Sequence, residues 1–378
     1  MKILSLSNCP LVESQGSGYI ILNFCRGLRQ RGHEVDLFGP ESYEPFQSLK
    51  KAKRYRQAAG MLLLAAYQLT QKKYDVIEFY GGESWLAASI LAKTPNRSSL
   101  LVSHSNGLET YYNELLMKYF NTFSSNASHN KWYQFNQKKI LEKAFTQVDG
   151  IVTLSEYECN YGLKHQYKND SHIVAIEPSL LNDYLGLAID FQRKPIIGYC
   201  GSWLQRKGSK LIEADISRLL TDFPECSFKL VGVGDSFRKS THFPSALCSR
   251  IEVIPFVKSK KELQNIYQML SILIVPSIYE SFGLVTSEAM ACGCAVVVSK
   301  TGFGASLKHR EEAVIIQEPV SPFLYEGVKE LLLNEPLRLQ IAKTGYQRVQ
   351  NLCWEAAVDQ LESIYLEWLN ELRQKHKY

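Results

Sequence analysis

The chain has 378 residues, more than the roughly 250–300 that one hydrophobic core usually supports, so we expect two domains. Its 45% hydrophobic and 21% charged residues are typical of a soluble globular protein. A formal net charge of +5 and a pI of about 8.6 are too small for a dedicated nucleic-acid binder.

The first predicted elements alternate between strand and helix. Ile3–Ser7 is an apolar run that predicts a strand, Tyr19–Arg31 has helical spacing, and Glu34–Phe38 predicts the next strand. Because no apolar signal sequence precedes the first strand, we expect a cytoplasmic protein. The longest apolar run, Ala58–Tyr67, is about half the length that a membrane-spanning helix needs.

The alternation continues to the end of the chain, with one interruption. It weakens in the polar stretch Glu177–Lys194, where we expect a linker, and it ends in an amphipathic helix that begins near Trp354. The other predicted strands are Asp75–Phe79, Leu100–Ser103, Ile151–Leu154, Ile173–Ile176, Ile196–Cys200, Phe228–Val231, Ile251–Ile254, Ile272–Pro276, Ala295–Ser299 and Val314–Ile316.

This alternation predicts an α/β fold of parallel sheets covered by helices on both faces. We expect two Rossmann-like, doubly wound domains, at residues 1–185 and 186–353, and a C-terminal helix at 354–378 that packs on the body of the protein. Ligands bind such folds outside the carboxyl ends of the strands, so we expect a cleft between the two sheets.

Glycine and cysteine patterns disfavour three other classes. Gly16 and Gly18 follow the first strand, but the third glycine of a dinucleotide-binding fingerprint would fall at Ile21, so a dehydrogenase is disfavoured. A P-loop after Gly232 fails because Arg238 stands where glycine should precede the lysine. The nine cysteines are scattered and form no zinc pattern, so we expect them to be reduced.

The most informative segment runs from Ser271 to Ser299. A buried strand ends near Ser277, a loop carries Glu280, a helix begins near Gly283 and ends at Gly293, and another buried strand follows at once. This is a complete βαβ unit. The N-terminus of its helix presents free backbone N–H groups and a partial positive charge, which suit a phosphate.

Two glutamates flank the start of this helix. Glu280 is expected in the loop and Glu288 more than one turn inside the helix, so they should contact different parts of an extended ligand. The simpler alternative is that both are solvated charges at a helix end. The neighbours of Glu280, Tyr279 and Phe282, and the apolar run after Glu288 weaken that alternative.

The motifs, taken together, resemble those of the retaining GT-B glycosyltransferases of the glycosyl transferases group 1 type (family four). Seven residues separate Glu280 from Glu288, with Phe-Gly-Leu between them and Ala-Met-Ala-Cys-Gly after them. Each motif is weak alone, but they occur in the family's order over most of the chain. The other matching segments are Gly16–Gly18, Arg31–Val35, Asp75–Glu78, Val102–Glu109, Asp149–Glu156, Gly198–Gly208 and Leu230–Gly234.

The resemblance implies roles on the donor side of the reaction, in the C-terminal domain. Glu280 would contact hydroxyls of the donor sugar near the reacting carbon, and Glu288 would bind the ribose. The backbone N–H groups of Phe282, Gly283 and Leu284 would hold the sugar and the phosphates.

Further roles follow from the same resemblance. Arg206 and Lys207 would neutralise the diphosphate, His104 would lie near the donor sugar, and the loop from Gly16 to Gly18 would close over the phosphates from the other domain. Without the resemblance, Arg206 and Lys207 are better explained as an exposed basic turn. His104 is then better explained as a hydrogen-bonded histidine in the core.

One position departs from the family pattern. The family often has Arg where this chain has Ser202, so one diphosphate contact is missing and Arg206 is the candidate to replace it. The alternative that this departure leaves open is a catalytically silent GT-B-like subunit that binds a sugar nucleotide or a partner. The presence of Glu280, Glu288 and Lys207 argues against it.

The expected function is therefore transfer of a sugar, with retention, from a nucleotide diphosphate sugar to an acceptor. Cell-surface glycan or glycolipid synthesis is the expected setting, and the acceptor is a saccharide or a lipid-linked molecule bound by the N-terminal domain. No Asp-x-Asp motif occurs, so we expect no metal and no bound cofactor. Nucleic acid is not an expected partner.

The stretch from Gln47 to Lys73 suggests an anionic membrane surface as a further partner. It contains no acidic residue and combines an apolar block, Met61–Tyr67, with seven basic residues. The simpler interpretation, which we favour, is a covering helix whose apolar block is buried. The basic residues are Lys50, Lys51, Lys53, Arg54, Arg56, Lys72 and Lys73.

Overall fold

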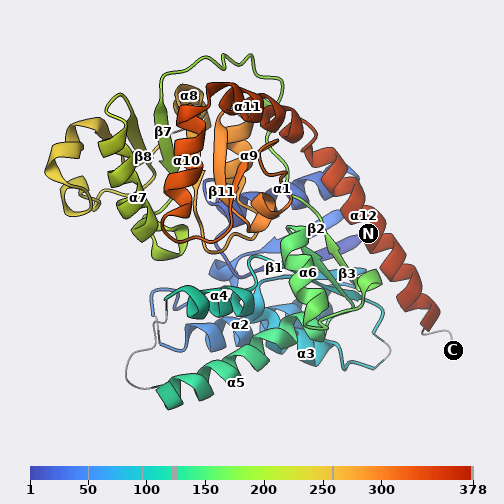
Figure 1. Ribbon diagram of the computed structural model, residues 1–378. Coiled ribbons are helices and arrows are strands. Elements are labelled where there is room, and N and C mark those ends of the chain that lie inside the picture. Colours follow the sequence, from blue (N-terminus) through green and yellow to red (C-terminus); the bar gives the residue numbers. More distant parts are fainter. Residues whose placement is uncertain (50, 96, 121–126, 258, 376–378) are drawn as a thin grey trace. The chain divides into compact units, whose positions relative to one another are not determined.

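The computed structural model describes residues 1–49, 51–95, 97–120, 127–257 and 259–375 (Figure 1). Its contacts divide the chain into two compact units, one of Met1–Pro178 with Trp354–Tyr378 and one of Ser179–Cys353. Each unit contains a parallel sheet of six strands. The predicted α/β fold with two doubly wound sheets is confirmed.

The first sheet has the strand order β2-β1-β3-β4-β5-β6. Its strands are β1 (Lys2–Ser7), β2 (Glu34–Phe38), β3 (Val76–Tyr80), β4 (Leu100–His104), β5 (Gly150–Thr153) and β6 (Ile173–Ala175). Every residue of β3, β4 and β5 is buried, because helices cover both faces of a parallel sheet. This burial explains why the strands could be predicted as continuous apolar runs.

Helices from both ends of the chain cover this sheet. They are α1 (Gly16–Gln30), α2 (Lys53–Gln71), α3 (Trp85–Leu91), α4 (Glu109–Phe120), α5 (Ala127–Thr146), α6 (Glu156–Lys164) and the C-terminal α12 (Trp354–Lys375). The last helix, α12, packs on α1 and β4. A Cβ atom at Gly27 would lie only 2.5 Å from Val358, so glycine permits this close approach.

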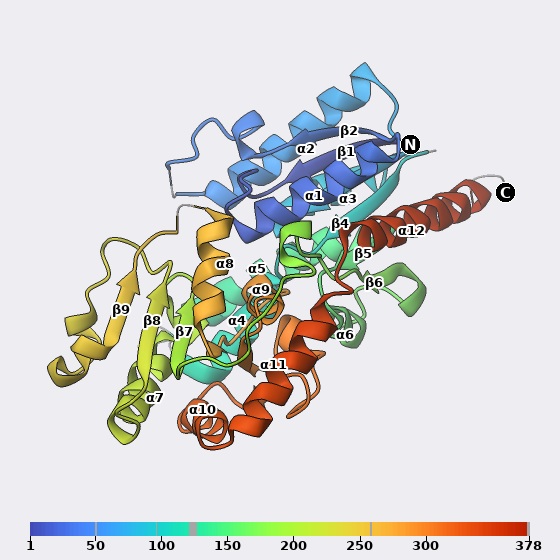
Figure 2. The same ribbon diagram turned by 90° about the horizontal axis from the view of Figure 1, so that it is seen from above.

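The second sheet has the strand order β12-β11-β10-β7-β8-β9. Its strands are β7 (Ile196–Cys200), β8 (Ser227–Val231), β9 (Ile251–Ile254), β10 (Ile272–Val275), β11 (Ala295–Ser299) and β12 (Val314–Ile316). Its helices are α7 (Ser209–Asp222), α8 (Lys260–Met269), α9 (Leu284–Ala291), α10 (Phe323–Leu333) and α11 (Glu335–Val349). Figure 2 shows β7, β8 and β9 side by side.

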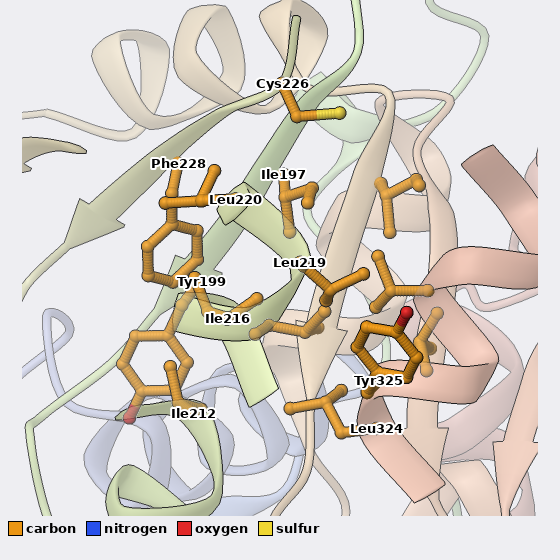
Figure 3. Close-up of a cluster of buried hydrophobic side chains, with 14 of the residues drawn as sticks. Ile197, Tyr199, Ile212, Ile216, Leu219, Leu220, Cys226, Phe228, Leu324 and Tyr325 are labelled. Carbon is orange, nitrogen blue, oxygen red and sulfur yellow. The ribbon is translucent and has the colours of Figure 1, made fainter. Parts of the chain in front are cut away.

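The core of the second unit lies between the sheet and the pair α7 and α10. Ile212, Ile216 and Leu219 of α7 recur at helical spacing and are fully buried against Phe228 and Leu324 (Figure 3). Complete burial of one such side chain is worth about 1.5–3 kcal/mol. This packing fixes the strand ends and the loops that leave them.

Both sheets reverse the direction of winding at one place. In the first sheet, β2 lies on one side of β1, whereas β3 to β6 follow one another on its other side, so the reversal is between β1 and β3. In the second sheet, β7 to β9 run toward one edge and β10 to β12 toward the other, so the reversal is between β7 and β10. Open α/β sheets bind ligands in the crevice outside the carboxyl ends of the strands at such a switch point. Each unit therefore has one position where the fold itself favours a ligand.

Candidate active site

Two loops meet at the switch point of the second sheet, one after β7 and one after β10. The Ile278 N–H donates a hydrogen bond of 2.9 Å to the carbonyl oxygen of Arg206. Gly208 has a φ of +84°, and a Cβ atom there would lie 2.4 Å from the Pro276 carbonyl oxygen. Glycine therefore lets the two loops touch, which places Arg206 and its neighbour beside the loop that carries Glu280.

Lys207 and Glu280 form the centre of the site. The Lys207 Nζ atom lies 2.5 Å and 2.8 Å from the two carboxylate oxygens of Glu280, and the Ser277 hydroxyl donates a bond of 2.6 Å to one of them. The two charged side chains are only 22% and 11% exposed. The carboxylate is thus held in one orientation by two donors.

The backbone of the Glu280 loop is held from the other side by the loop after β11. The Glu280 N–H donates to Thr301 Oγ1 at 2.9 Å, and the Phe303 N–H donates to the Phe282 carbonyl oxygen at 2.7 Å. A Cβ atom at Gly302 would lie 2.3 Å from that same carbonyl oxygen. The Glu280 loop is therefore clamped between two neighbouring loops, as a preorganised site requires.

The loop ends at the N-terminus of α9, where the sequence predicts phosphate binding. Gly283 is the residue before the helix and has a φ of +99°, a conformation that favours glycine. No side chain caps this helix. The N–H groups of its first turn, starting with Leu284, are therefore suited to an anion, and a Cβ atom at Gly283 would lie 3.6 Å from that of Glu280.

Glu288 lies one turn further along α9. The Tyr267 hydroxyl donates to its carboxylate at 3.4 Å, and burial raises the pKa of this carboxyl to about 7, against the opposing effects of Lys260 and Tyr267. Near neutral pH the group therefore exists in both protonation states, and a bound hydroxyl group could accept or donate a hydrogen bond there.

Arg206, next to Lys207 in the same turn, is a second cation of the candidate site. Its side chain is half-buried, and in the described part of the chain its guanidinium has no carboxylate within ion-pair distance. Ser202 is exposed and supplies no charge; its carbonyl oxygen accepts a bond of 2.8 Å from the Tyr199 hydroxyl. This arrangement leaves Arg206 available to a diphosphate, while Lys207 is already paired.

His104 lies in the first unit, at the end of β4, and its imidazole is fully buried. Its Nε2 atom is 2.6 Å from the Tyr365 hydroxyl, which in turn donates to Glu78 at 2.6 Å. Burial lowers the pKa of His104 to about 3, so the ring is neutral. The structure therefore places this residue in an internal polar network with α12, and its role toward a donor sugar stays a prediction.

The glycine pair of the first unit differs from expectation in its local structure. Gly16 and Gly18 were predicted to form a loop before a helix that starts at Tyr19, but α1 begins at Gly16 and includes both glycines in its first turn. A Cβ atom at Gly18 would lie 2.5 Å from the Val12 carbonyl oxygen, so the glycine lets the preceding segment pack on the helix. The first-turn N–H groups remain suited to an anion.

Several residues around the site were not singled out from the sequence. Ser277 and Thr301 orient Glu280, and Tyr267 contacts Glu288. The available signal was that Ser277 and Thr301 are polar residues, each the second residue after the carboxyl end of a buried strand. Among the described residues, no group of three or more His, Cys, Asp or Glu side chains is arranged to hold a metal ion.

Comparison with known families matches nearly the whole chain in two segments. Residues 189–348 match the model described as Glycosyl transferases group 1, and residues 14–178 match the model described as Glycosyltransferase Family 4. The chain is 25% identical to a D-inositol 3-phosphate glycosyltransferase of Corynebacterium diphtheriae, over 97% of this chain and 94% of that protein. It is 29% identical to an uncharacterized glycosyltransferase of Methanocaldococcus jannaschii, over 59% of this chain and 61% of that one.

Solved structures show the same fold. A sucrose-phosphate synthase from Thermosynechococcus elongatus has a TM-score of 0.79 at 17% identity, with 98% of this chain and 99% of that chain covered. WaaG, a glycosyltransferase involved in lipopolysaccharide biosynthesis, has a TM-score of 0.71 at 16% identity, with coverage of 97% and 99%. The predicted GT-B type of fold is confirmed by these likenesses.

Proposed function

We propose, since the chain belongs to the glycosyltransferases of the group 1 type (family four), that it transfers a sugar from a nucleotide diphosphate sugar to an acceptor hydroxyl with retention of anomeric configuration. The observation that carries this proposal is the Lys207–Glu280 pair at the switch point of the second sheet, beside the N-terminus of α9. A diphosphate leaving group needs positive charge and N–H donors, and a sugar needs a carboxylate that accepts hydrogen bonds from its hydroxyls. This place in the fold offers both side by side.

The proposed mechanism relies on charge stabilisation rather than on a protein nucleophile. As the bond to the anomeric carbon breaks, negative charge grows on the diphosphate oxygens, and Arg206, Lys207 and the N–H groups at Gly283 and Leu284 would stabilise it. One unit charge at 4 Å is worth about 4 kcal/mol at an effective dielectric constant near 20. Glu280, held by Lys207 and Ser277, would orient the sugar hydroxyls.

The remaining donor contacts complete the proposal. Glu288 would bind the ribose, Phe282 would contribute its backbone N–H to the sugar and phosphates, and Gly16 and Gly18 would offer first-turn N–H groups of α1 to the phosphates. His104 would lie near the donor sugar, at the end of β4 in the first unit. With cations and helix ends to meet the diphosphate, the reaction should require no metal and no bound cofactor.

A screen of nucleotide sugars tests the proposal. The intact protein should be stabilised against heat by one nucleotide sugar and should release the nucleoside diphosphate from it, because a ligand at 100 times its dissociation constant adds about 2.7 kcal/mol of stability. Proton NMR of the product should show the anomeric configuration of the donor, and EDTA should leave the rate unchanged. Binding without any release would favour the silent subunit, and complete loss of rate in EDTA that manganese or magnesium restores would refute metal independence.

The acceptor and the cellular setting belong to the same proposal. The relatives named as D-inositol 3-phosphate glycosyltransferases make inositol 3-phosphate a first acceptor to try. WaaG shares only the fold with this chain, but its involvement in lipopolysaccharide biosynthesis agrees with our proposal of cell-surface glycan or glycolipid synthesis. Isolation of lipid-linked and polymeric glycans from cells without this protein would test that setting, because an unchanged glycan profile would contradict it.

A membrane surface is proposed as a further partner, and α2 provides the observation for it. No helix in the described part of the chain is both long and apolar enough to cross a bilayer. The apolar block of α2 is only half packed: Met61 and Ala65 are fully buried, whereas Leu63 and Tyr67 are 69% and 59% exposed. Tyr55, eight residues before Leu63 in the same helix, is also exposed.

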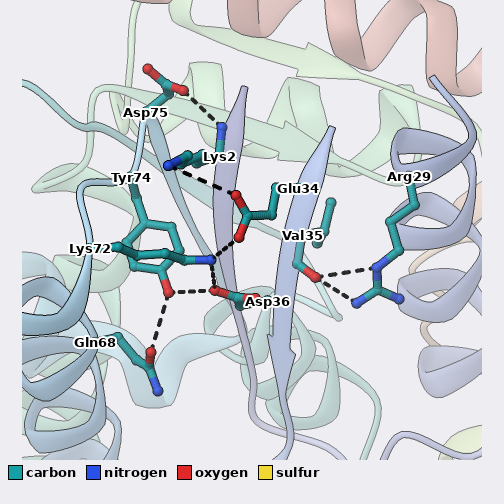
Figure 4. A network of polar contacts seen from close by, with 9 residues as sticks. All are labelled: Lys2, Arg29, Glu34, Val35, Asp36, Gln68, Lys72, Tyr74 and Asp75. Carbon is teal, nitrogen blue, oxygen red and sulfur yellow. Dashed lines mark hydrogen bonds and ion pairs between the residues drawn. The ribbon is translucent and has the colours of Figure 1, made fainter. Parts of the chain in front are cut away.

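The structure reduces the number of basic residues that could contact anionic lipids. Arg54, Arg56 and Lys72 are already paired with carboxylates of the first unit (Figure 4 shows Lys72 with Glu34 and Asp36). Lys51, Lys53 and Lys73 are exposed, and Lys50 lies outside the described residues.

Sedimentation with anionic vesicles should show reversible binding that weakens in high salt. Combined replacement of Lys51 and Lys53 by Gln and of Leu63 and Tyr67 by Ser should abolish it. The same changes should leave the unfolding temperature unchanged, because these side chains are exposed. Absence of binding at low salt would end the membrane proposal.

A further inference from the structure

The first unit has a polar cluster at its own switch point, between β1 and β3. Asn8 directly follows β1, and its amide nitrogen donates a hydrogen bond of 2.7 Å to Glu83 from the loop after β3. Asn106, from the loop after β4, donates a bond of 3.1 Å to the amide oxygen of Asn8. Three strand ends therefore present amide and carboxylate groups at the place where this fold favours a ligand.

Arg54, from the start of α2, joins this cluster. Its guanidinium lies 2.6 Å from a carboxylate oxygen of Glu109 and 3.7 Å from one of Glu83, and it also donates to the side chain of Gln137. The Glu83 side chain is only 10% exposed, and that of Glu109 is 37% exposed. Burial raises the pKa of the Glu109 carboxyl, and the nearby Glu83 adds to this effect.

The charge of the cluster is negative. One arginine faces two carboxylates, so the Arg54 charge is already neutralised and one negative charge remains. Arg26 of α1 pairs with Glu13 of the loop after β1, but the loops that follow five of the six strands carry no cation of their own. The segments that follow β1, β3, β4, β5 and β6, which are residues 8–18, 81–85, 105–109, 154–158 and 176–178, together contain six Glu and no Lys, Arg or His.

We infer from this cluster that the first unit selects an acceptor without negative charge, namely a neutral saccharide or polyol. Amide and carboxylate groups together offer the donors and acceptors that sugar hydroxyls need. A phosphate or carboxylate next to the accepting hydroxyl meets like charge instead of the arginine it would need. The inference rests on the proposed function and departs from the relatives named for inositol 3-phosphate in the charge of the acceptor.

Matched acceptor pairs test the inference. With the nucleotide sugar that the protein turns over, release of nucleoside diphosphate is measured with myo-inositol against inositol 3-phosphate, glucose against glucose 6-phosphate, and N-acetylglucosamine against its 6-phosphate. The neutral member of at least one pair should accelerate release, and its phosphorylated form should be at least tenfold less effective. Glu83→Gln and Glu109→Gln should each reduce this preference about tenfold, because each removes one repelling charge.

A matched control separates the cluster from a general effect of charge. Glu34→Gln also removes a glutamate that is ion-paired within the first unit. Glu34 is the first residue of β2 and pairs with Lys2 and Lys72 at the amino ends of the strands, whereas the cluster lies beyond their carboxyl ends (Figure 4). Glu34→Gln should leave the preference unchanged.

The inference is overturned if a phosphorylated member is preferred, if no neutral member accelerates release, or if the preference survives both cluster variants. Binding and slow hydrolysis of the nucleotide sugar without acceptor are measured alongside. Their loss would instead count against the proposed function.

Discussion

Replacement of Lys207 by Met tests the centre of the donor site. The change keeps the length of the side chain but removes the charge that contacts both carboxylate oxygens of Glu280. Loss of one preorganised contact to a developing charge lowers turnover by about 10²–10³. Glu280 would also be left with an unbalanced charge, which repels the diphosphate and destabilises the second unit.

The size of the effect on stability follows from the exposure of the pair. Removing one partner of a fully buried pair costs about 3–5 kcal/mol, whereas an exposed pair contributes about 0–1 kcal/mol. With side chains 22% and 11% exposed and the Ser277 hydrogen bond retained, we expect a loss of about 1–2 kcal/mol. For a unit of this size, that is a decrease of about 2–6 °C in the unfolding temperature.

The double variant Lys207→Met, Glu280→Gln separates stability from catalysis. It removes both charges and leaves a neutral amide that can still accept the Ser277 hydrogen bond, so the unfolding temperature should return close to that of the wild type. Transfer should stay at or below the rate of the single variant. The assays are differential scanning fluorimetry and nucleoside diphosphate release at saturating donor. Normal turnover of the single variant, or recovery of turnover in the double variant, would refute the assigned roles.

Three further outcomes are expected. Arg206→Ala should weaken binding of the nucleotide sugar about tenfold, because this guanidinium is not engaged by a carboxylate in the described part of the chain; unchanged affinity in calorimetry would show that it faces only solvent. Affinity for an intact nucleotide sugar should rise with pH through about 7, as Glu288 becomes a carboxylate that accepts ribose hydroxyls, and Glu288→Gln should make the profile flat; an identical profile in the variant would contradict this role. The pKa of His104 is lowered to about 3 by burial, so the unfolded chain binds a proton that the folded one does not between about pH 6.5 and 3, and the free energy of unfolding should fall as pH falls below about 6.5. Urea midpoints at pH 7 and pH 5 measure this, and His104→Gln should lose less stability between the two pH values than the wild type; an equal loss would contradict it.

Most of the fold could be predicted from the sequence because parallel strands are buried on both faces. The predicted bounds of β2, β7, β9, β11 and β12 are those of the structure, and the other strands differ by one residue at one or both ends. Continuous apolar runs of four to six residues carry this information locally. The first turn of α1 was missed because glycines at Gly16 and Gly18 favour neither a helix nor a loop strongly.

Helix α2 shows what local sequence patterns cannot predict, namely which side chains are buried and which are ion-paired. Its block Met61–Tyr67 is apolar nearly all round, which predicts a buried helix, yet Leu63 and Tyr67 are largely exposed. The basic residues around it appeared free because no acidic residue is near in sequence. Arg54 is in fact paired with Glu109, 55 residues further along the chain. Partners so distant in sequence are set by tertiary structure and leave no local signal.

The candidate site was also predicted only in part: the sequence identifies some of its residues but not their contacts. Glu280, Gly283 and Lys207 could be found because they belong to motifs at strand ends and at a helix start. That Lys207 contacts Glu280 depends on the winding of the sheet, which brings the loop after β7 against the loop after β10. His104 ends β4, one residue beyond the predicted strand, and its side chain contacts Tyr365, 261 residues away, which the sequence does not reveal.

Hydrogen–deuterium exchange of the intact protein, with and without the nucleotide sugar that it turns over, tests the donor site most directly. Backbone amides at residues 206–208 and 282–286 should exchange more slowly in the presence of the nucleotide sugar, because the ligand covers the η5 turn (Gln205–Lys207) and the first turn of α9. Some protection near Gly16 would agree with its proposed contact to the phosphates. Protection confined to the first unit, with no change at either segment of the second, would contradict the placement of the donor site.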